Sequence, residues 1–170
     1  WLRACDFAPA ARALRGAGVN RLSFGMQSAD DRQLRALGRR HTARGFASAV
    51  KAARQCGFEH LSFDLMLATP GQTNADIDSA VKLCAQLGAE HVSAYLLKIE
   101  QGTPFAARHI EAECPDEDGQ ADLYLYAVEA LARQGYEQYE ISNFARDGHV
   151  ARHNLKYWDG KEYLGVGPAA

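Results

Sequence analysis

The feature that most constrains the fold is a short sequence pattern that recurs along the chain. Three segments share a glycine, a polar connection, an apolar residue and a serine: Gly18-Val-Asn-Arg-Leu-Ser23, Gly57-Phe-Glu-His-Leu-Ser62 and Gly88-Ala-Glu-His-Val-Ser93. Gly135 begins a looser fourth copy. Each glycine follows an amphipathic stretch, where glycine commonly takes the left-handed conformation that ends a helix. The pattern therefore marks places where a helix is followed by a strand.

Hydrophobic spacing predicts the helices themselves. Apolar residues recur three and four apart in the stretches before the last three of these glycines, and shorter helices are predicted over residues 9–15 and 30–37. Thr42 is a candidate N-cap for the first of the long helices. Thr73, with Asp76 three residues later, predicts a capping box at the start of the second.

The segments that follow the glycines predict strands over residues 21–26, 60–67 and 91–97. They are short and largely apolar, which is typical of strands covered on both faces. Strand, helix and strand recurring about every 30 to 40 residues predict parallel strands joined by right-handed crossovers, and hence an α/β fold. The pattern alone fits either an open sheet or the arc of a barrel.

The sequence changes character after Gly135, where short aromatic-rich segments replace the long helices. Further strands or a hairpin that extends the sheet are predicted over residues 136–144, 155–158 and 163–166. We therefore divide the chain into strand–helix units over residues 1–135 and a terminal group of strands over residues 136–170. Because the chain begins with Trp1 and stops directly after a predicted strand, we expect it to be an internal piece of a longer protein.

The composition excludes several classes of protein. Apolar residues make up 47% and charged residues 24% of the 170 residues, as in ordinary globular domains. The 19 basic and 21 acidic residues give a net charge of −2 without a basic stripe, which argues against nucleic acid as a partner. No apolar run approaches the roughly 18 residues that a transmembrane segment needs, and no signal peptide opens the chain. We therefore expect a cytoplasmic protein.

The four cysteines are irregularly spaced and form no Cys-x-x-Cys pair: Cys5, Cys56, Cys84 and Cys114. By themselves they offer no recognisable zinc or iron–sulfur site. Cys56 and Cys84 continue the apolar faces of predicted helices, where cysteine behaves as a small hydrophobic residue. We expect them to be reduced, structural thiols.

One carboxylate stands inside a predicted strand. Asp64 lies in the apolar segment 61–66, and a buried carboxylate is costly unless it has a partner. A structural hydrogen bond or a ligand would each satisfy it, and the pattern leaves both open. Gln27 ends the first strand, at the edge where ligands bind in this fold class, or else caps the next helix. Arg39 is either a solvated side chain or a clamp for a carboxylate.

Two histidines form a second group of candidates. His149 precedes the segment His153-Asn-Leu-Lys-Tyr-Trp158. Imidazole is a common ligand of metals, including haem iron, although a histidine beside aromatic residues is more often an ordinary hydrogen-bonded side chain. The residues alone therefore predict an α/β ligand-binding domain with Asp64 and Gln27 near a pocket.

Seven blocks of this sequence occur in the order found in a known family. They are Gly18-Val-Asn-Arg-Leu-Ser-Phe-Gly-Met-Gln-Ser28, Leu37-Gly-Arg-Arg-His41, Phe63-Asp-Leu-Met-Leu-Ala-Thr-Pro-Gly-Gln-Thr73, Tyr95-Leu-Leu-Lys-Ile-Glu-Gln-Gly-Thr-Pro-Phe105, Tyr139-Glu-Ile-Ser-Asn-Phe-Ala145, His153-Asn-Leu-Lys-Tyr-Trp158 and Tyr163-Leu-Gly-Val-Gly-Pro168. Together they resemble the radical S-adenosylmethionine proteins related to oxygen-independent coproporphyrinogen III oxidase. The block that begins at His153 favours the haem chaperone (HemW-type) branch of that family.

The resemblance implies a six-unit partial barrel that binds S-adenosylmethionine. A glutamine, an arginine twelve residues later and a strand aspartate hold this cofactor in the family, and they match Gln27, Arg39 and Asp64. His153 and His149 are the nearest candidates for a haem site. The family's Cys-x-x-x-Cys-x-x-Cys motif, which holds a 4Fe-4S cluster, does not occur in this sequence. We therefore expect the cluster ligands upstream, and no catalytic residue and no radical chemistry in this chain alone.

The implied function is that of a haem chaperone, which binds haem or porphyrin and passes haem to a membrane-linked acceptor. One alternative is the oxidase itself, which decarboxylates two propionates of coproporphyrinogen III. A second alternative is an unrelated partial-barrel enzyme that uses Asp64 as a general base. The sequence does not decide whether the protein is an enzyme.

Overall fold

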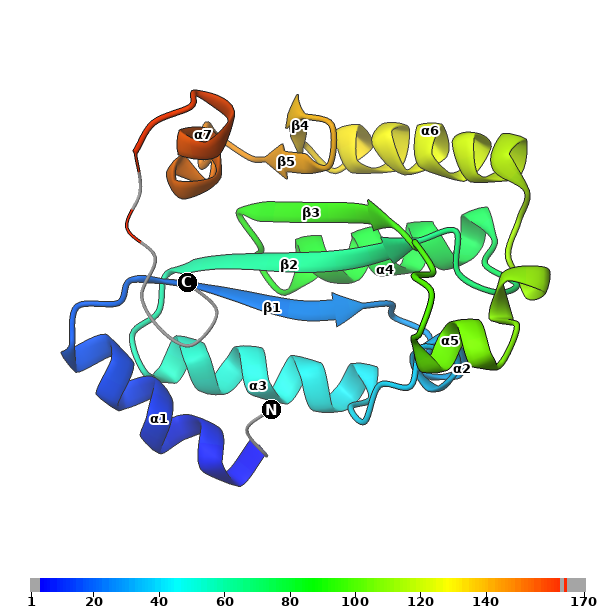
Figure 1. Cartoon of the computed structure of the whole chain (residues 1–170). Coiled ribbons are helices and arrows are strands. Elements are labelled where there is room, and N and C mark those ends of the chain that lie inside the picture. Colours follow the sequence, from blue (N-terminus) through cyan, green and yellow to red (C-terminus); the bar gives the residue numbers. More distant parts are fainter. Residues whose placement is uncertain (1–3, 163, 165–170) are drawn as a thin grey trace.

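The computed structural model describes residues 4–162 and 164. Helices and strands alternate along most of this range (Figure 1). The elements in chain order are α1 (Ala4–Gly16), β1 (Arg21–Gln27), α2 (Asp31–Ala36), α3 (Ala43–Gln55), β2 (His60–Leu67), α4 (Asn74–Gln86), β3 (His91–Leu96), α5 (Pro104–Ala107), the 3-10 helix η1 (Ile110–Glu113), α6 (Glu117–Arg133), β4 (Glu137–Glu140), β5 (Asn143–Ala145) and α7 (Arg152–Trp158).

The strands form one sheet in the order β1-β2-β3-β5-β4. β1, β2 and β3 are mutually parallel, whereas β5 runs antiparallel to both β3 and β4. The predicted α/β class and the parallel units are therefore confirmed, and the described strands form an open arc rather than a closed barrel. The hairpin predicted over residues 136–144 is confirmed as β4 and β5, which extend the sheet beyond β3.

The local signals at the helix ends predicted their positions well. The Thr42 side chain accepts a hydrogen bond from the Gly45 N–H at the start of α3. Thr73 and Asp76 form the predicted capping box at the start of α4. The glycine after each long helix has a positive φ, for example +85° at Gly57. Glycine reaches this region without strain, so each helix ends where the recurring pattern places it.

The long helices α1, α3, α4 and α6 cover one face of the sheet and form the core there. Phe46 of α3 packs edge to face on Phe63 of β2, with ring centroids 4.9 Å apart. The other buried apolar side chains of this layer come from all three parallel strands and the long helices: Met26, Val50, Leu61, Leu65, Ile77, Val81, Cys84, Val92, Ala94, Ala127 and Leu131. Among the described helices, none combines the length and the apolar character that a membrane crossing requires.

The opposite face of β1, β2 and β3 is polar. Side chains alternate between the two faces of a strand. The residues on this second face are Arg21, Ser23, His60, Ser62, Asp64, His91, Ser93 and Tyr95. This polar face is still largely covered in β2 and β3, as expected, since Ser62, His91 and Ser93 are at most 5% exposed. The apolar appearance of these strands comes from one face only.

The segment 155–158 was predicted to be a strand and is instead part of helix α7. Its aromatic residues favour a strand locally. In the structure, Tyr157 lies one helical turn after His153, and the two side chains are hydrogen bonded. This contact between residues four apart favours a helix. It was not considered in the strand prediction, because His153 lies outside residues 155–158. The predicted strand 163–166 falls outside the described residues except for Leu164.

Candidate functional site

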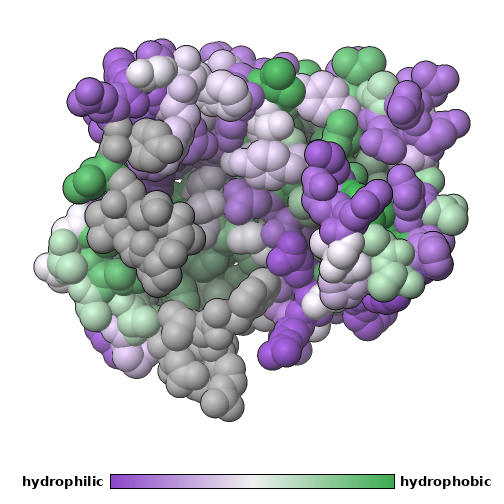
Figure 2. Space-filling view, viewed as in Figure 1, coloured by the Kyte–Doolittle hydropathy of each residue, from purple (hydrophilic) through white to green (hydrophobic). Residues whose placement is uncertain are grey.

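A cavity of about 750 Å³ lies against the polar face of the three parallel strands. Its other wall is the segment 148–154, which joins β5 to α7. This segment lies at the end of the sheet where the parallel strands begin (Figure 1). Hydrophilic residues dominate the surface around α7, at the upper left of Figure 2. The cavity is therefore a polar site between the sheet and the connection to α7.

Asp64 projects into this cavity from the middle of β2. The Ser23 hydroxyl on β1 donates to its carboxylate, with distances of 3.1 and 3.3 Å to the two oxygens. Burial raises the pKa of Asp64, and hydrogen bonds from Ser23 and Ser93 only partly oppose this. Among the described residues no cation pairs with Asp64. Its carboxylate can therefore accept further hydrogen bonds from a ligand.

Gln27 lies at the carboxyl end of β1 and is almost fully buried, at 8% exposure. A Cβ atom added to Gly25 would lie 2.6 Å from Gln27 Nε2, so the Gln27 amide occupies the space beside Gly25. Gly25 pairs in register with Asp64. The Gln27 Oε1 atom is buried without a hydrogen-bond partner among the described residues. Gln27 is therefore directed back along the strand toward the position of Asp64, with an unused acceptor.

Arg39 lies after α2, in the loop that leads to α3. Its backbone N–H donates to the Leu34 carbonyl at 2.8 Å, and its side chain is half-buried. Neither Arg39 nor Gln27 lines the cavity described above. The structure thus places Asp64 on the cavity wall, and it places Gln27 and Arg39 toward the opposite end of the strands from the segment 148–154.

The two predicted histidines lie on that segment and line the cavity together with Asp64. His153 is exposed in the first turn of α7, and its Nε2 is 3.1 Å from the Tyr157 hydroxyl. His149 has 42% of its side chain exposed and faces Glu90, with 3.5 Å between Nδ1 and Oε2. The predicted residues therefore form two groups, one at the middle and carboxyl end of the sheet and one at its amino end.

Sequence reasoning missed a buried chain of hydrogen bonds behind the cavity. His91 is 1% exposed and shares hydrogen bonds with the Ser62 hydroxyl through Nδ1 and with the Tyr139 hydroxyl through Nε2, each 2.7 Å long. The Tyr139 oxygen also accepts from the Ala151 N–H. Burial lowers the pKa of His91 to about 4, so its ring is neutral at physiological pH. This chain fixes the start of α7 to the sheet.

The residues present fit part of the cofactor set that the resemblance implies. The orphaned Gln27 amide oxygen and the incompletely paired Asp64 carboxylate are acceptors suited to ribose hydroxyls or to an ammonium group. The cysteines do not fit an iron–sulfur cluster, because the sequence contains no triad of suitable spacing. Of the three described thiols that are free, Cys84 is fully buried, and burial raises its pKa to about 12.

Comparisons with known proteins show what this chain is similar to. The Radical SAM superfamily profile matches residues 3–84. The chain is 38% identical over 161 residues to the heme chaperone HemW of Lactococcus lactis subsp. lactis (strain IL1403), which covers 94% of this chain and 42% of that protein. It is 42% identical over 159 residues to HemW of Mycobacterium tuberculosis (strain ATCC 25618 / H37Rv), with 92% and 41% covered.

A mitochondrial relative and a solved structure extend the comparison. The chain is 39% identical over 160 residues to the radical S-adenosyl methionine domain-containing protein 1 of Bos taurus, covering 93% of this chain and 36% of that protein. The fold matches coproporphyrinogen III oxidase (HemN) from Escherichia coli with a TM-score of 0.74 and 24% identity, over 90% of this chain and 35% of that chain.

The extent of the likeness differs between these comparisons. The chain spans about two-fifths of the length of the HemW proteins that it matches. The similarity to them continues through β4, β5 and α7, well beyond the residues matched by the superfamily profile. Residues 3–84 match the radical SAM superfamily, and over nearly all of its length the chain is similar to proteins named heme chaperone HemW.

Proposed function

We propose that the protein binds haem and passes it on, and that His153 is the residue of this chain that contacts the haem iron. The observation that carries the proposal is the placement of His153, exposed on the wall of a polar cavity with one ring nitrogen held by Tyr157. In the tautomer that this proposal requires, Nε2–H donates to the Tyr157 oxygen and Nδ1 is the metal ligand. Similarity to proteins named heme chaperone supports the same assignment.

The surroundings of His153 suit a large, flat and partly apolar ligand. Tyr157 and Trp158 are 47% and 65% exposed on the same short helix, and flat aromatic side chains can stack against a porphyrin ring. Arg21 and Arg152 line the cavity and carry the charge that carboxylate groups of a porphyrin require. Of the two parts into which we divided the chain, we therefore assign haem binding to the second, residues 136–170.

We assign the other end of the sheet, within residues 1–135, to S-adenosylmethionine. Gln27 supplies a hydrogen-bond acceptor there, and Asp64 supplies a second from the middle of β2, where it also lines the cavity. Arg39 is kept as a candidate for the carboxylate group. When bound to a 4Fe-4S cluster whose ligands lie outside this sequence, that cofactor supplies radical chemistry. The part of this chain is to bind and orient the cofactor, and we assign it no catalytic residue.

A haem titration tests the proposal on the full-length protein. His153→Ala should weaken haem binding at least tenfold and change the Soret band, because the iron loses a ligand. His109→Asn is the matched control, since His109 is exposed and its left-handed backbone conformation is one that asparagine tolerates. Unchanged haem affinity and an unchanged spectrum in His153→Ala would overturn the assignment. Turnover of coproporphyrinogen III by the full-length protein would instead favour the oxidase.

The same proposal has consequences for location and partners. We infer a cytoplasmic, reducing compartment, which the free thiols Cys56, Cys84 and Cys114 support. A haem carrier needs an acceptor, and we propose a membrane-linked haem protein for that role. Transfer of haem from the loaded protein to acceptor-containing membrane vesicles, followed by absorbance, tests this step. Retention of all the haem on the carrier would count against it.

A further inference from the structure

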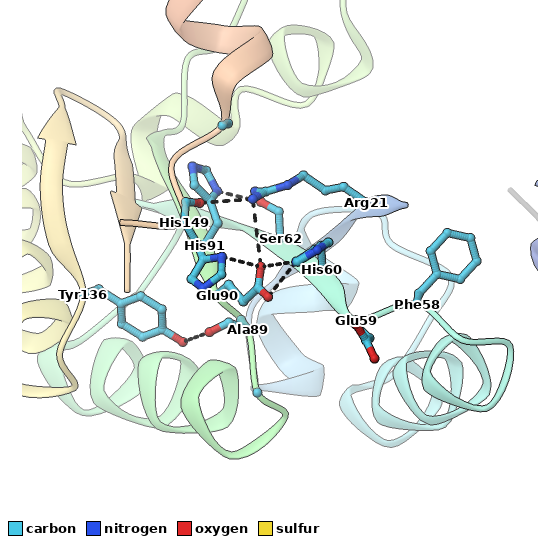
Figure 3. Close-up of polar contacts among 12 residues, drawn as sticks. Arg21, Phe58, Glu59, His60, Ser62, Ala89, Glu90, His91, Tyr136 and His149 are labelled. Carbon is cyan, nitrogen blue, oxygen red and sulfur yellow. Dashed lines mark hydrogen bonds and ion pairs between the residues drawn. The ribbon is translucent and has the colours of Figure 1, made fainter. Parts of the chain in front are cut away.

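Two histidines and a glutamate meet at the amino end of the sheet, beside the cavity (Figure 3). His60 begins β2, Glu90 immediately precedes β3, and His149 lies in the connection to α7. Their ligand atoms all lie within 4.8 Å of one another. No role in the proposed haem or S-adenosylmethionine contacts requires His60 or Glu90.

We propose that His60, Glu90 and His149 bind a divalent transition-metal ion, with zinc as the best match to the ligand set. Two imidazoles and one carboxylate are a ligand set that proteins use for zinc with a fourth position left open. Imidazole also suits nickel and copper, whereas magnesium and calcium prefer oxygen ligands throughout. The proposal concerns binding of the free ion and is independent of haem.

Two of the three ligand separations are near those around a tetrahedral ion. Ligand atoms 2.0–2.1 Å from such an ion lie about 3.3 Å from one another. In the structure, Glu90 Oε2 lies 3.0 Å from His60 Nδ1 and 3.5 Å from His149 Nδ1. These two separations lie on either side of the tetrahedral value. The third edge, between the two histidines, needs only a side-chain movement, because both rings are partly exposed.

The neighbouring residues hold the three ligands in place. The two histidine rings lie 6.0 Å apart at 38°, and the Arg21 guanidinium donates to the His149 carbonyl at 3.1 Å. That bond ties the segment carrying His149 to the start of β1. His60 and His149 also line the cavity, so the open coordination position of the bound ion faces its interior.

Arg21 also limits the strength of the site. Its guanidinium lies 3.9 Å from Glu90 Oε2, and a positive charge at that distance opposes a second cation. The alternative is that the cluster holds no ion and simply ties the segment 148–154 to the sheet through hydrogen bonds to Glu90. The two accounts differ in one measurable property, the stoichiometric binding of zinc.

Titration of the full chain with zinc alone tests the proposal, with reduced thiols and no haem or S-adenosylmethionine present. We expect one zinc ion per chain by calorimetry. His149→Ala and Glu90→Gln should each weaken that binding at least tenfold, whereas His109→Asn should bind as the wild type does. Cobalt in place of zinc should give ligand-field bands without thiolate charge-transfer absorption, which excludes binding at the cysteines.

Failure of the wild type to bind zinc stoichiometrically, or equal binding by the site variants, would overturn the proposal. Circular dichroism verifies that each variant is folded. If His149→Ala does not fold, His60→Gln provides the same test of zinc binding. Because the titration contains no haem and leaves His153 intact, its failure would leave the proposed haem site standing. Loss of haem binding in His153→Ala with zinc binding retained would likewise separate the two sites.

Discussion

At the scale of single residues, His91 is a titratable side chain held neutral inside the protein. Burial lowers its pKa from 6.5 to about 4 in the folded state. Between these two values the unfolded chain binds a proton that the folded chain does not, so stability falls as pH falls through this window. This effect is of order 3 kcal/mol once pH is below both values. Above pH 6.5 it vanishes.

Urea unfolding at pH 7.5 and pH 5 measures this contribution. The wild type should lose about 2 kcal/mol more than His91→Gln between the two values, because glutamine keeps hydrogen-bonding capacity but does not titrate. The control is the variant itself, whose remaining pH dependence comes from all other groups. An identical loss in both proteins would show that the pKa of His91 is the same in the folded and unfolded chains.

Asp64 illustrates the opposite sign. Burial raises its pKa in the folded state, so the folded chain binds a proton more readily than the unfolded chain, and stability falls as pH rises through this range. Asp64→Asn should therefore raise the free energy of unfolding at pH 7 by about 1 kcal/mol. The gain should shrink as pH falls through the raised pKa of Asp64, because the wild-type carboxyl then takes up a proton.

The same substitution should weaken S-adenosylmethionine binding by the full-length protein. A gain in stability together with a loss of cofactor affinity would mark Asp64 as a residue kept for function. Equal affinity in both proteins would remove it from the cofactor site. The sequence could single out Asp64, because a carboxylate within an apolar strand is conspicuous. It could not single out His91, since the burial that changes its pKa comes from residues far away in the chain.

At the scale of elements, the sequence predicted those helices and strands whose ends carry local signals. Thr42, Thr73 and the positive-φ glycines act within a few residues, so their effect can be read without a structure. Helix α7 carries no side-chain cap at Ala151. Its start is fixed by Tyr139, from another element, so no local capping signal in the sequence marked where the helix begins.

The capping box of α4 makes a direct prediction for stability. Thr73→Ala removes the hydroxyl that accepts from the Asp76 N–H, and it should lower the free energy of unfolding by about 1 kcal/mol. Thr73→Ser, which keeps the hydroxyl, is the control. Chemical denaturation of both variants gives the comparison. Equal destabilisation by alanine and serine would mean that the methyl group of Thr73, rather than the cap, matters.

Helix α7 should depend on the Tyr139 hydroxyl. Tyr139→Phe removes the acceptor for the Ala151 N–H and one partner of the buried His91 ring. We expect a loss of about 2 kcal/mol, since two hydrogen bonds disappear and one buried nitrogen is left unsatisfied. Hydrogen exchange should become faster across residues 148–158 and stay unchanged in α3. Unchanged protection of α7 would show that other contacts fix it.

At the scale of the whole molecule, strand register decides which side chains meet. The pattern Gly-x-Glu-His occurs before both β2 and β3 and would suggest that its two copies lie side by side. The register is instead offset, because His91 pairs with Ser62 rather than with His60. Glu90 therefore reaches His60, and His91 is buried beside Ser62. The contact between Glu90 and His60 depends on this offset, so the sequence alone could not predict it. The sequence also could not predict that His149, from the segment after β5, lies beside these two residues.

The arrangement of the sheet also separates the two proposed ligand sites. β1 runs from Arg21, beside His149, to Gln27, and its seven residues span about 20 Å. Gly25→Ala would bring a Cβ atom against the Gln27 amide and should displace it, which weakens S-adenosylmethionine binding at least several-fold. His153→Ala acts at the other end and should weaken haem binding alone. Groups this far apart without shared partners usually contribute independently.

The double variant tests this separation in the full-length protein. Its losses of affinity for haem and for S-adenosylmethionine should equal those of the two single variants, within about 0.5 kcal/mol for each ligand. Serine at position 25 adds a Cβ atom as alanine does, and it should reproduce the loss of cofactor affinity. If Gly25→Ala weakened haem binding as strongly as His153→Ala does, the two ligands would have to share one site along the polar face, centred on Asp64.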